Sequence, residues 1–337
     1  MSISKNKKIL VTGADGFIGS HLVNKLISLG HDVRAMTMYN SFNNWGWLDT
    51  FDKRLLRKIE VVSGDIRDKK FVTDSCKDID VIFHLASLIA IPYSYKSPYS
   101  YVSTNIEGTL NILEAALNFE IENIVHTSTS EVYGESNTIA ISEESKSIAR
   151  SPYSATKIGA DQLAYSYYST FGLPVSTIRP FNTYGPRQSS RAIIPTIITQ
   201  LLSDNYTIKL GSLDPTRDFC FVEDTVSGFL SVASNKKSIG EVINIGSGYE
   251  ISIKDLVSMI GDIMDVKITI KSDKNRIRPK DGEVDRLRAN INKAKKILKW
   301  EPGYKGKAGL KNGLEKTIEW FKDDENSKQY KTNIYNV

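Results

Sequence analysis

Cysteine is scarce in this chain, and its scarcity excludes two kinds of architecture. The 337 residues contain two cysteines, Cys76 and Cys220. Two thiols cannot build a disulfide framework, and by themselves they cannot hold a structural metal ion. We therefore expect both to be reduced packing residues, and we expect no metal site.

Long apolar runs are also absent. With 40% hydrophobic and 25% charged residues, and no apolar stretch near the length of a bilayer span, the composition argues against both disorder and membrane insertion. The opening residues, MSISKNKKIL, lead directly into an expected strand and lack the apolar core of a signal peptide. We therefore expect a cytoplasmic protein.

A large excess of one charge is lacking too, since the formal net charge is only +5. Lysines and arginines do crowd residues 271–299, which include KSDKNRIRPK. Such a stretch either binds nucleic acid or an anionic small molecule, or forms a solvated face. A dinucleotide-binding sensor that holds RNA there is the reading we favour least, and we expect no nucleic-acid partner.

What the sequence does contain is a regular alternation of short β-rich runs with longer amphipathic patterns. The runs KKILVTG, HDVRAMTM, IEVVSGD and VIFHLAS are separated by such patterns, and further helices are expected at residues 99–119 and 152–171. This alternation is typical of βαβ units. We expect an α/β fold with a Rossmann-type doubly wound parallel sheet covered on both faces.

After Pro180 this rhythm changes, which indicates a smaller α/β lobe interleaved with the first. We expect a dinucleotide-binding domain at residues 1–180 plus about 218–248. A substrate-binding lobe would take residues 181–217 and 249–325, and residues 326–337 would form a tail that is frayed or laid on a neighbour. A loop with two tryptophans, Trp45 and Trp47, must bury them against the second lobe, a neighbouring subunit or the cofactor.

The segment VTGADGFIGS places Gly13, Gly16 and Gly19 between an expected strand and an expected helix. Glycines at this spacing allow a tight turn, close approach to a diphosphate and close helix packing, while the helix start offers free N–H groups. We therefore predict a dinucleotide cofactor.

The end of the second strand leaves the kind of dinucleotide open. A carboxylate is expected there to hold the adenosine ribose, but the strand ends in Met36, Thr37 and Met38, and Arg34 lies inside it. NAD is our expectation, and NADP is not excluded. Asp65 and Ile66, after the third strand, either contact the adenine or form a capped turn.

The spacing Tyr153-x-x-x-Lys157 puts a phenol and an ammonium one turn apart on one helix face. A lysine charge beside a phenol lowers the phenol pKa, so the tyrosine can act as a general base near neutral pH. The pair can therefore take a proton from a sugar hydroxyl as hydride leaves the same carbon.

These segments, with HLAS at 84–87, STSEVYG at 128–134, YSATK at 153–157 and RPFNTYGPRQ at 179–188, resemble the extended short-chain dehydrogenase/reductase superfamily from about Lys7 to Trp300. RDFCFVEDT at 217–225 and the run at 278–302 are similar to GDP-mannose 4,6-dehydratases. YNSFNNWGWLDT at 39–50 is closer still to 4,6-dehydratases of bacterial legionaminic acid biosynthesis, which act on nucleotide-linked N-acetylglucosamine.

The resemblance implies a nucleotide-sugar 4,6-dehydratase and assigns roles at the strand end. Oxidation of C4 to a ketone makes the C5 proton acidic, so Glu131 would remove it before water leaves from C6. Thr129 would bind the C4 oxygen and relay its proton to Tyr153. Ser130 stands where many dTDP-glucose dehydratases carry an acid, so the donor to the leaving hydroxyl is open and Glu131 itself is one candidate.

The resemblance also assigns binding residues. The expected catalytic residues are Thr129, Ser130, Glu131, Tyr153 and Lys157. The expected cofactor contacts are Gly13, Gly16, Phe17, Ile18, Gly19, Thr37, Asp65, Ile66, Leu85, Ala86, Tyr153 and Lys157. The expected substrate contacts are Ser87, Asn182, Arg187, Arg217 and Arg278, whose arginines suit a diphosphate.

Two other reactions and an assembly state accompany this interpretation. A UDP-glucuronate decarboxylase carries the same Thr-Ser-Glu run and the same Tyr/Lys pair, whereas a 4-epimerase has no use for a base at C5. Our leading substrate is GDP- or UDP-linked N-acetylglucosamine. The helices at 99–119 and 152–171 pair across a two-fold axis in this superfamily, so we expect a homodimer.

Overall fold

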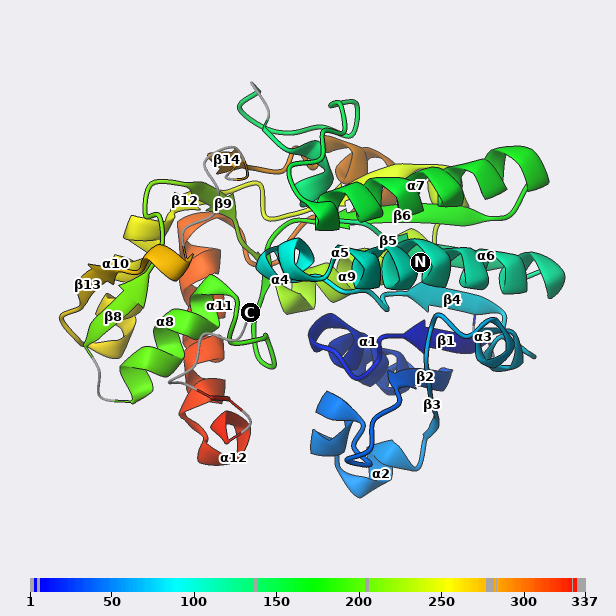
Figure 1. Cartoon of the computed structure of the whole chain (residues 1–337), viewed down its shortest axis with the longest axis horizontal. Coiled ribbons are helices and arrows are strands. Elements are labelled where there is room, and N and C mark those ends of the chain that lie inside the picture. Colours follow the sequence, from blue (N-terminus) through cyan, green and yellow to red (C-terminus); the bar gives the residue numbers. More distant parts are fainter. Residues whose placement is uncertain are drawn as a thin grey trace.

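The fold is that of a computed structural model, which describes residues 3–4, 7–135, 138–203, 206–276, 282, 284–328 and 330–331. A parallel sheet with helices on both faces adjoins a smaller lobe built largely from the later part of the chain (Figure 1). This arrangement confirms the predicted Rossmann-type α/β fold with a smaller interleaved lobe.

The main sheet has seven strands, and every neighbouring pair in it is parallel. In spatial order the strands are β11 (Val242–Ile245), β6 (Val175–Pro180), β5 (Asn123–Thr127), β4 (Val81–His84), β1 (Lys8–Thr12), β2 (Asp32–Met38) and β3 (Ile59–Gly64). The winding reverses between β1 and β4. In open parallel sheets, ligands bind outside the carboxyl ends of the strands at such a reversal.

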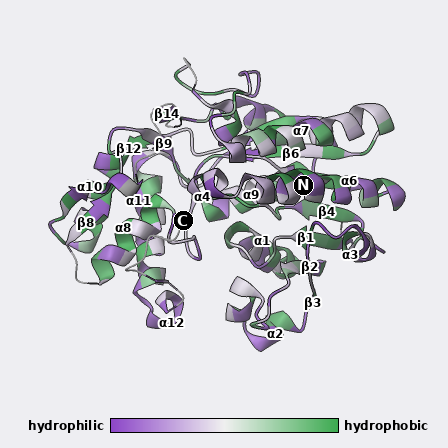
Figure 2. Ribbon diagram, in the orientation of Figure 1, coloured by the Kyte–Doolittle hydropathy of each residue, from purple (hydrophilic) through white to green (hydrophobic). Residues whose placement is uncertain are grey.

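Helices cover both faces because successive side chains of each strand point in opposite directions. On β1, Ile9 and Val11 join one hydrophobic core, with α1 (Phe17–Ser28) and α9 (Val222–Ala233), while Leu10 joins the other. The second core lies under α3 (Lys69–Ser75), α6 (Gly108–Asn118) and α7 (Pro152–Phe171). Figure 2 shows apolar residues along these central strands and a hydrophilic outer helix, α12 (Asp324–Ser327).

The helix α7 occupies the residues predicted from the sequence. Ser151 and Ser154 form a reciprocal capping box at its start, and Pro152 occupies the first turn. Gly172 ends it in the left-handed conformation, with φ of 70°. The sequence therefore contains the residues that start and end this helix.

The predicted helix at residues 99–119 is not continuous. It is divided into α5 (Pro98–Tyr101), a π-helical segment η2 (Val102–Glu107) and α6. A π-helical turn shifts the register of the side chains that follow it, and such turns are frequent at functional sites. Here the turn includes Asn105, whose contacts are described below.

The smaller lobe contains the remaining strands in three short sheets. Their strands are β7 (Thr183–Tyr184), β8 (Thr207–Leu210), β9 (Thr216–Asp218), β10 (Cys220–Phe221), β12 (Glu250–Ser252), β13 (Thr269–Ser272) and β14 (Arg286–Leu287). Its larger helices are α8 (Ile193–Leu202), α10 (Ile253–Met264) and α11 (Gly306–Lys322). Shorter helical segments, shared between the two lobes, are η1 (Gly46–Thr50), α2 (Lys53–Leu56), α4 (Ile91–Lys96), η3 (Ser130–Tyr133), η4 (Lys236–Ser238), η5 (Lys274–Arg276) and η7 (Ala294–Leu298).

Three further observations bear on the composition. Cys76 and Cys220 are free and buried. Among the residues that the structure describes, no cluster of three or more histidine, cysteine, aspartate or glutamate side chains is placed to hold a metal ion. No described helix combines the length and the apolar character that a bilayer crossing needs.

An aromatic cluster joins the two lobes. The Trp47 ring in η1 lies 5.5 Å from the Trp320 ring of α11 and 5.9 Å from the Tyr330 ring, measured between centroids. The Trp47 backbone nitrogen donates to the Asp15 carbonyl in the glycine turn at 3.0 Å. Of the three locations that the sequence left open for this loop, Trp47 occupies the second lobe, and the described part of the tail, at Tyr330, packs on the same cluster.

Replacing Trp47 by alanine should destabilise the fold, because the contact between the lobes loses its central ring. We expect the free energy of unfolding to fall by about 2 kcal/mol, less than the ~3–5 kcal/mol typical of large aromatic residues in a core. The control is Phe42→Ala, which removes a ring that is 84% exposed in the same loop. Denaturant unfolding measures the stability of both variants, and equal stability of Trp47→Ala and Phe42→Ala would contradict the role given to Trp47.

Candidate active site

The turn between β1 and α1 carries the glycines of the predicted dinucleotide loop. Gly13 has φ of 66°, and a Cβ atom there would lie 2.9 Å from the Ala86 backbone nitrogen. A Cβ atom at Gly19 would lie 2.1 Å from the Gly13 carbonyl oxygen. The turn therefore packs directly on the first turn of α1 and on the segment after β4, with no room for side chains.

The first turn of α1 supplies backbone donors. Gly16 caps the helix without a side-chain hydrogen bond, so the N–H groups of Phe17 and Ile18 have no intrahelical acceptor. The positive end of the helix dipole lies at the same place. Leu85 and Ala86, which follow β4, line the other side of the turn. The donors and the space that side chains would fill both fit a dinucleotide diphosphate.

At the end of β2, Thr37 is buried and its hydroxyl lies 2.8 Å from the Ser63 hydroxyl. Met38, the next residue, is 63% exposed. Arg34 points into the protein, where its guanidinium pairs with Glu60 at 2.9 Å. The arginine noted in this strand is thus committed to a structural ion pair and is not available to a ribose phosphate.

The turn after β3 holds Asp65 in a local network. Its carboxylate accepts a hydrogen bond from the Arg67 backbone nitrogen at 2.9 Å and pairs with the Arg67 guanidinium. Asn111 of α6 donates to the Ile66 carbonyl at 3.1 Å. The structure thus shows the turn-capping alternative for Asp65, while contact of either residue with an adenine stays a prediction.

A buried chain of hydrogen bonds connects β1, β4 and α6, and the sequence did not reveal it. The Thr12 hydroxyl accepts from the backbone nitrogens of Leu85 and Ala86, both at 3.0 Å, so its proton points to His84 Nδ1 at 2.9 Å. His84 Nε2 then donates to the Thr109 hydroxyl at 3.0 Å. His84 is neutral in this arrangement, and burial holds its pKa well below the ordinary value.

Asn105, in the π-helical segment, is a second residue that sequence reasoning missed. Its side-chain oxygen accepts from the Ser87 hydroxyl at 3.0 Å and from the Leu88 backbone nitrogen at 2.8 Å. Its side-chain nitrogen donates to the Leu88 carbonyl and to the Thr156 hydroxyl of α7, both at 3.0 Å. Asn105 therefore fixes the segment after β4 against α7, and it holds Ser87, a predicted substrate contact.

The predicted catalytic run begins two residues after the end of β5, and it forms the cap and the start of η3. The Thr129 hydroxyl accepts from the Glu131 backbone nitrogen at 3.3 Å, which caps this short helix. Ser130 is buried, with 2% of its surface exposed, whereas Glu131 is half-buried. Ser130 thus faces the interior, and Glu131 is the member of the run with a carboxylate open to a ligand.

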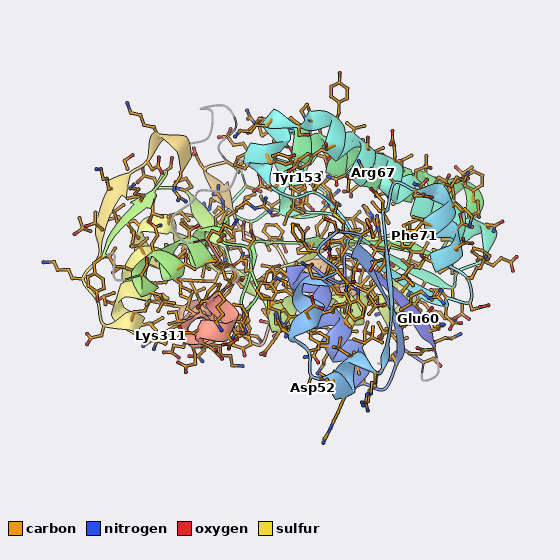
Figure 3. All side chains as sticks on the ribbon, turned by 60° about the horizontal axis from the view of Figure 1, so that its bottom comes forward. Asp52, Glu60, Arg67, Phe71, Tyr153 and Lys311 are labelled. Atoms are coloured by element: carbon orange, nitrogen blue, oxygen red, sulfur yellow. The ribbon has the colours of Figure 1, made fainter. Side chains whose placement is uncertain are left out.

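Tyr153 and Lys157 lie on α7 beside this run, and both are buried. Figure 3 shows Tyr153 at the start of α7, on the side where the two lobes meet. The Thr129 hydroxyl and the Glu131 charge at the strand end are both close enough to act on the pKa of the phenol. The Lys157 ammonium donates to the Thr127 carbonyl at 2.6 Å. The structure therefore brings the phenol, the ammonium and the carboxylate of Glu131 together.

The electrostatics of the phenol differ from the expectation. Burial raises the pKa of Tyr153 above its ordinary range, the Glu131 charge raises it further, and the hydrogen bond with Thr129 opposes both. Burial also lowers the pKa of Lys157 to about 8, and its proton is directed to Thr127. The expected lowering of the phenol pKa is therefore not found: burial raises the pKa of Tyr153, and the Lys157 ammonium is directed to the Thr127 carbonyl.

The predicted substrate contacts are spread over both lobes. Asn182 has a buried side-chain nitrogen without a partner in the described part of the chain. Arg187 lies beside α1, with its guanidinium 3.3 Å from the Ser20 hydroxyl and 5.1 Å from the Phe51 ring centre. Arg217 is buried in β9 and donates to the Thr216 carbonyl at 2.9 Å. Arg278 lies outside the described residues.

Residues 10–313 match the protein family described as GDP-mannose 4,6 dehydratase. The UDP-N-acetyl-alpha-D-glucosaminuronate decarboxylase of Bacillus cytotoxicus is 32% identical over 336 residues, covering 95% of this chain and 99% of that protein.

Two solved structures are similar over most of their length. UDP-glucuronic acid 4-epimerase from Bacillus cereus, in complex with UDP-glucuronic acid and NAD, has a TM-score of 0.84 at 32% identity, covering 96% of this chain and 100% of that one. The dTDP-glucose 4,6-dehydratase DesIV from Streptomyces venezuelae, with NAD and TYD bound, has a TM-score of 0.83 at 28% identity, covering 96% and 99%.

The raised pKa of Tyr153 can be measured directly. In the ligand-free protein this phenol should stay protonated up to about pH 10, the ordinary value for tyrosine, because its anion would be buried. The measurement is the ultraviolet difference titration of the protein against its Tyr153→Phe variant. The Tyr99→Phe variant, which removes a phenol that is 86% exposed, gives the reference for a tyrosine in solvent. A Tyr153 phenolate formed near neutral pH without ligand would contradict this electrostatic account.

Proposed function

Because the chain belongs to the GDP-mannose 4,6 dehydratase family of the extended short-chain dehydrogenase/reductases, we propose that it is an NAD-dependent nucleotide-sugar 4,6-dehydratase of the cytoplasm. The observation that carries the proposal is the half-buried Glu131 carboxylate beside the Tyr153 phenol. Oxidation at C4 needs only the phenol as a base, whereas elimination needs a second base near C5. The site holds both groups.

The first step in this proposal is the removal of the proton from the sugar C4 hydroxyl. NAD, when bound at the glycine turn, supplies the acceptor for the C4 hydride and later returns the hydride to C6. Thr129 binds the C4 oxygen and passes the C4 hydroxyl proton to the Tyr153 phenolate, which forms only when the positive charge of bound NAD lowers the phenol pKa from its raised value. Lys157, one helical turn from Tyr153, anchors the same strand end through the Thr127 carbonyl.

The second step is elimination, which we assign to Glu131. Once C4 is a ketone, the C5 proton is acidic because the resulting carbanion is stabilised by the carbonyl group. Glu131 removes this proton, and water leaves from C6. Ser130 is buried and has no acidic proton to give. We therefore assign the protonation of the leaving hydroxyl to Glu131 as well, which carries the C5 proton after the first transfer.

The substrate in this proposal is GDP- or UDP-linked N-acetylglucosamine, held by the lobe of residues 181–217 and 249–325. Arg187 and Arg217 are the described arginines that we assign to the diphosphate, because one guanidinium group can donate hydrogen bonds to two phosphate oxygens. The unpartnered Asn182 side-chain nitrogen supports a hydrogen bond from this residue to the substrate.

A UDP-sugar acid decarboxylase is the second candidate, and the decarboxylase relative favours keeping it. In that reaction, C4 oxidation labilises a C5 carboxylate, and carbon dioxide leaves in place of water. A 4-epimerase uses the same oxidation but needs no base at C5. Incubation with GDP-, UDP-, CDP- and dTDP-sugars distinguishes the three by product mass: loss of water, loss of carbon dioxide, or no change.

The basic stretch gives little support to a nucleic-acid function. Several of its described cations are paired with acids: Arg276 with Asp273, Arg286 with Glu250, Lys293 with Glu241 and Lys295 with Glu301. Paired cations release fewer counterions on binding a phosphate backbone, so they contribute less affinity. The chemistry of the Tyr153 and Glu131 site is the better supported function.

Replacing Glu131 by glutamine should separate oxidation from elimination. Turnover should fall by about 10²–10⁴-fold, the usual contribution of a general base, while the near-ultraviolet signal of reduced nicotinamide still forms on adding substrate. The matched control is Glu135→Gln, an exposed carboxylate four residues on, which should leave turnover unchanged. In deuterated water the wild-type product should gain one deuterium at C5. Full turnover by the Glu131→Gln variant would refute the assignment.

We also propose a homodimer through α5, η2, α6 and α7. Large side chains exposed on these helices include Tyr99, Val102, Tyr165 and Phe171, with 86%, 42%, 56% and 56% of their surfaces exposed. Apolar groups in such number on adjacent helices are typical of an interface. Figure 1 shows α6 and α7 side by side on the outside of the sheet.

Charge placed on this face should break the dimer, since a carboxylate there would be buried without a partner. The double variant Val102→Asp/Tyr165→Asp should scatter light as a monomer, whereas the wild type should scatter as a dimer. Phe42→Asp adds a charge elsewhere on the surface and serves as the control. A wild-type monomer would disprove the proposed assembly.

A further inference from the structure

One face of α7 meets the end of β5 at three successive turns. Tyr153, Lys157 and Asp161 are spaced four residues apart, so their side chains share that face. The Tyr153 phenol lies close enough to Thr129 for that hydroxyl to act on its pKa, and Lys157 donates to the Thr127 carbonyl at 2.6 Å. The sequence resemblance accounts for the first two positions of this face, and it assigns no role to the third.

Asp161 is the most heavily bonded member of this face. Its Oδ2 accepts from the Ser128 hydroxyl at 2.7 Å and from Arg179 Nη2 at 2.8 Å, while its Oδ1 lies 3.1 Å from His126 Nε2. Each of these four residues is at most 6% exposed. Asp161 therefore ties α7 to β5, which carries His126 and ends just before Ser128, and to β6, which carries Arg179.

The protonation states in this cluster follow from its bonds. Burial lowers the pKa of His126, so the ring is neutral and its Nε2–H donates to the carboxylate. Burial alone would raise the pKa of Asp161, but the hydrogen bonds from His126 and Ser128 and the Arg179 charge lower it below its ordinary value. Asp161 is thus an anion, and it is one carboxylate between two buried cations, Lys157 and Arg179.

We propose that Asp161 is a positioning residue of this active site: it holds the strand end of Thr129 and Glu131 against α7 and places its negative charge one helical turn from Lys157. Ser128 is the residue immediately before Thr129, so the 2.7 Å bond from Ser128 fixes where the catalytic run begins. The catalytic meaning of this inference rests on the proposed function, but the arrangement of charges does not.

Other groups around Lys157 cannot replace Asp161 in this role. His126 on β5 and His84 on β4 are neutral rings whose pKa values burial and the Lys157 charge both lower. Arg179 on β6 carries a like charge, and Tyr153 on α7 is a buried phenol. The Glu131 charge in η3 raises the pKa of Tyr153. Burial lowers the pKa of Lys157 to about 8, and the Asp161 anion opposes this lowering.

A purely structural role for Asp161 makes a different prediction. If Asp161 only anchored the strands, replacing either Asp161 or Arg179 would destabilise the protein. The two replacements would not shift the Lys157 pKa in opposite directions. If it compensates the Lys157 charge, removing the anion lowers the Lys157 pKa, whereas removing the competing cation raises it. The sign of the two shifts therefore separates the two roles.

The experiment measures the titration of Lys157 by NMR in full-length protein labelled with ¹³C at the lysine ε-carbon, with Lys157→Met for assignment. In Asp161→Asn the Lys157 pKa should fall by about one unit or more. The matched control, Asp224→Asn, replaces a buried carboxylate of α9 that accepts from the Gly303 and Tyr304 backbone nitrogens at 2.7 and 2.9 Å. It should leave the Lys157 titration unchanged.

The second variant, Arg179→Gln, keeps the test decisive if Asp161→Asn fails to fold. It should raise the Lys157 pKa, and the alkaline limb of the rate of C4 oxidation should move in the same direction. An unchanged Lys157 titration in a folded Asp161→Asn variant, or a fall in Arg179→Gln, would overturn the proposal. Because the titration needs no substrate, failure of the wild type to convert any nucleotide sugar would refute the proposed function and leave this result standing.

Discussion

The site depends on the contact between one face of α7 and the end of β5. The phenol and the ammonium come from the helix, while the hydroxyl of Thr129 and the carboxylate of Glu131 come from the residues after the strand. The helix groups and the strand-end groups are far apart in the sequence, so their relative geometry depends on how α7 packs against β5. Burying charges there is costly unless each finds a partner, and the bonds to Thr127 and Ser128 provide those partners.

The polar groups beneath the cofactor turn obey the same constraint. Thr12, His84 and Thr109 satisfy one another in a fixed order of donors and acceptors, and Asn105 does the same for the segment after β4. Buried networks of this kind are specific when every member is paired, because any alternative arrangement leaves an unpaired group in a medium of low dielectric constant. The edge of the sheet where ligands would bind is therefore stiff before any ligand arrives. The carboxylate of Glu131, by contrast, is only half-buried.

The sequence predicted the parts of the molecule that follow local rules. The glycine turn, the limits of α7 and the alternation of strand and helix are set by spacing, capping residues and terminators, and all of them were found. It did not predict Asn105, whose importance comes from a π-helical turn that no simple period reveals, nor the partner of Trp47, which lies more than 270 residues away in α11. The direction of the Tyr153 pKa shift was also missed, because a sequence displays the neighbouring lysine but not the extent of burial.

The aromatic cluster at the lobe boundary has a practical consequence. Of the four tryptophans in the chain, Trp47 and Trp320 meet edge to face across that boundary, while the Trp300 indole donates to Ser227. Indole emission depends on the surrounding polarity and on nearby rings. Two of the four tryptophans thus sit where any relative movement of the lobes would change their surroundings, so tryptophan emission would report such a movement in the unlabelled protein.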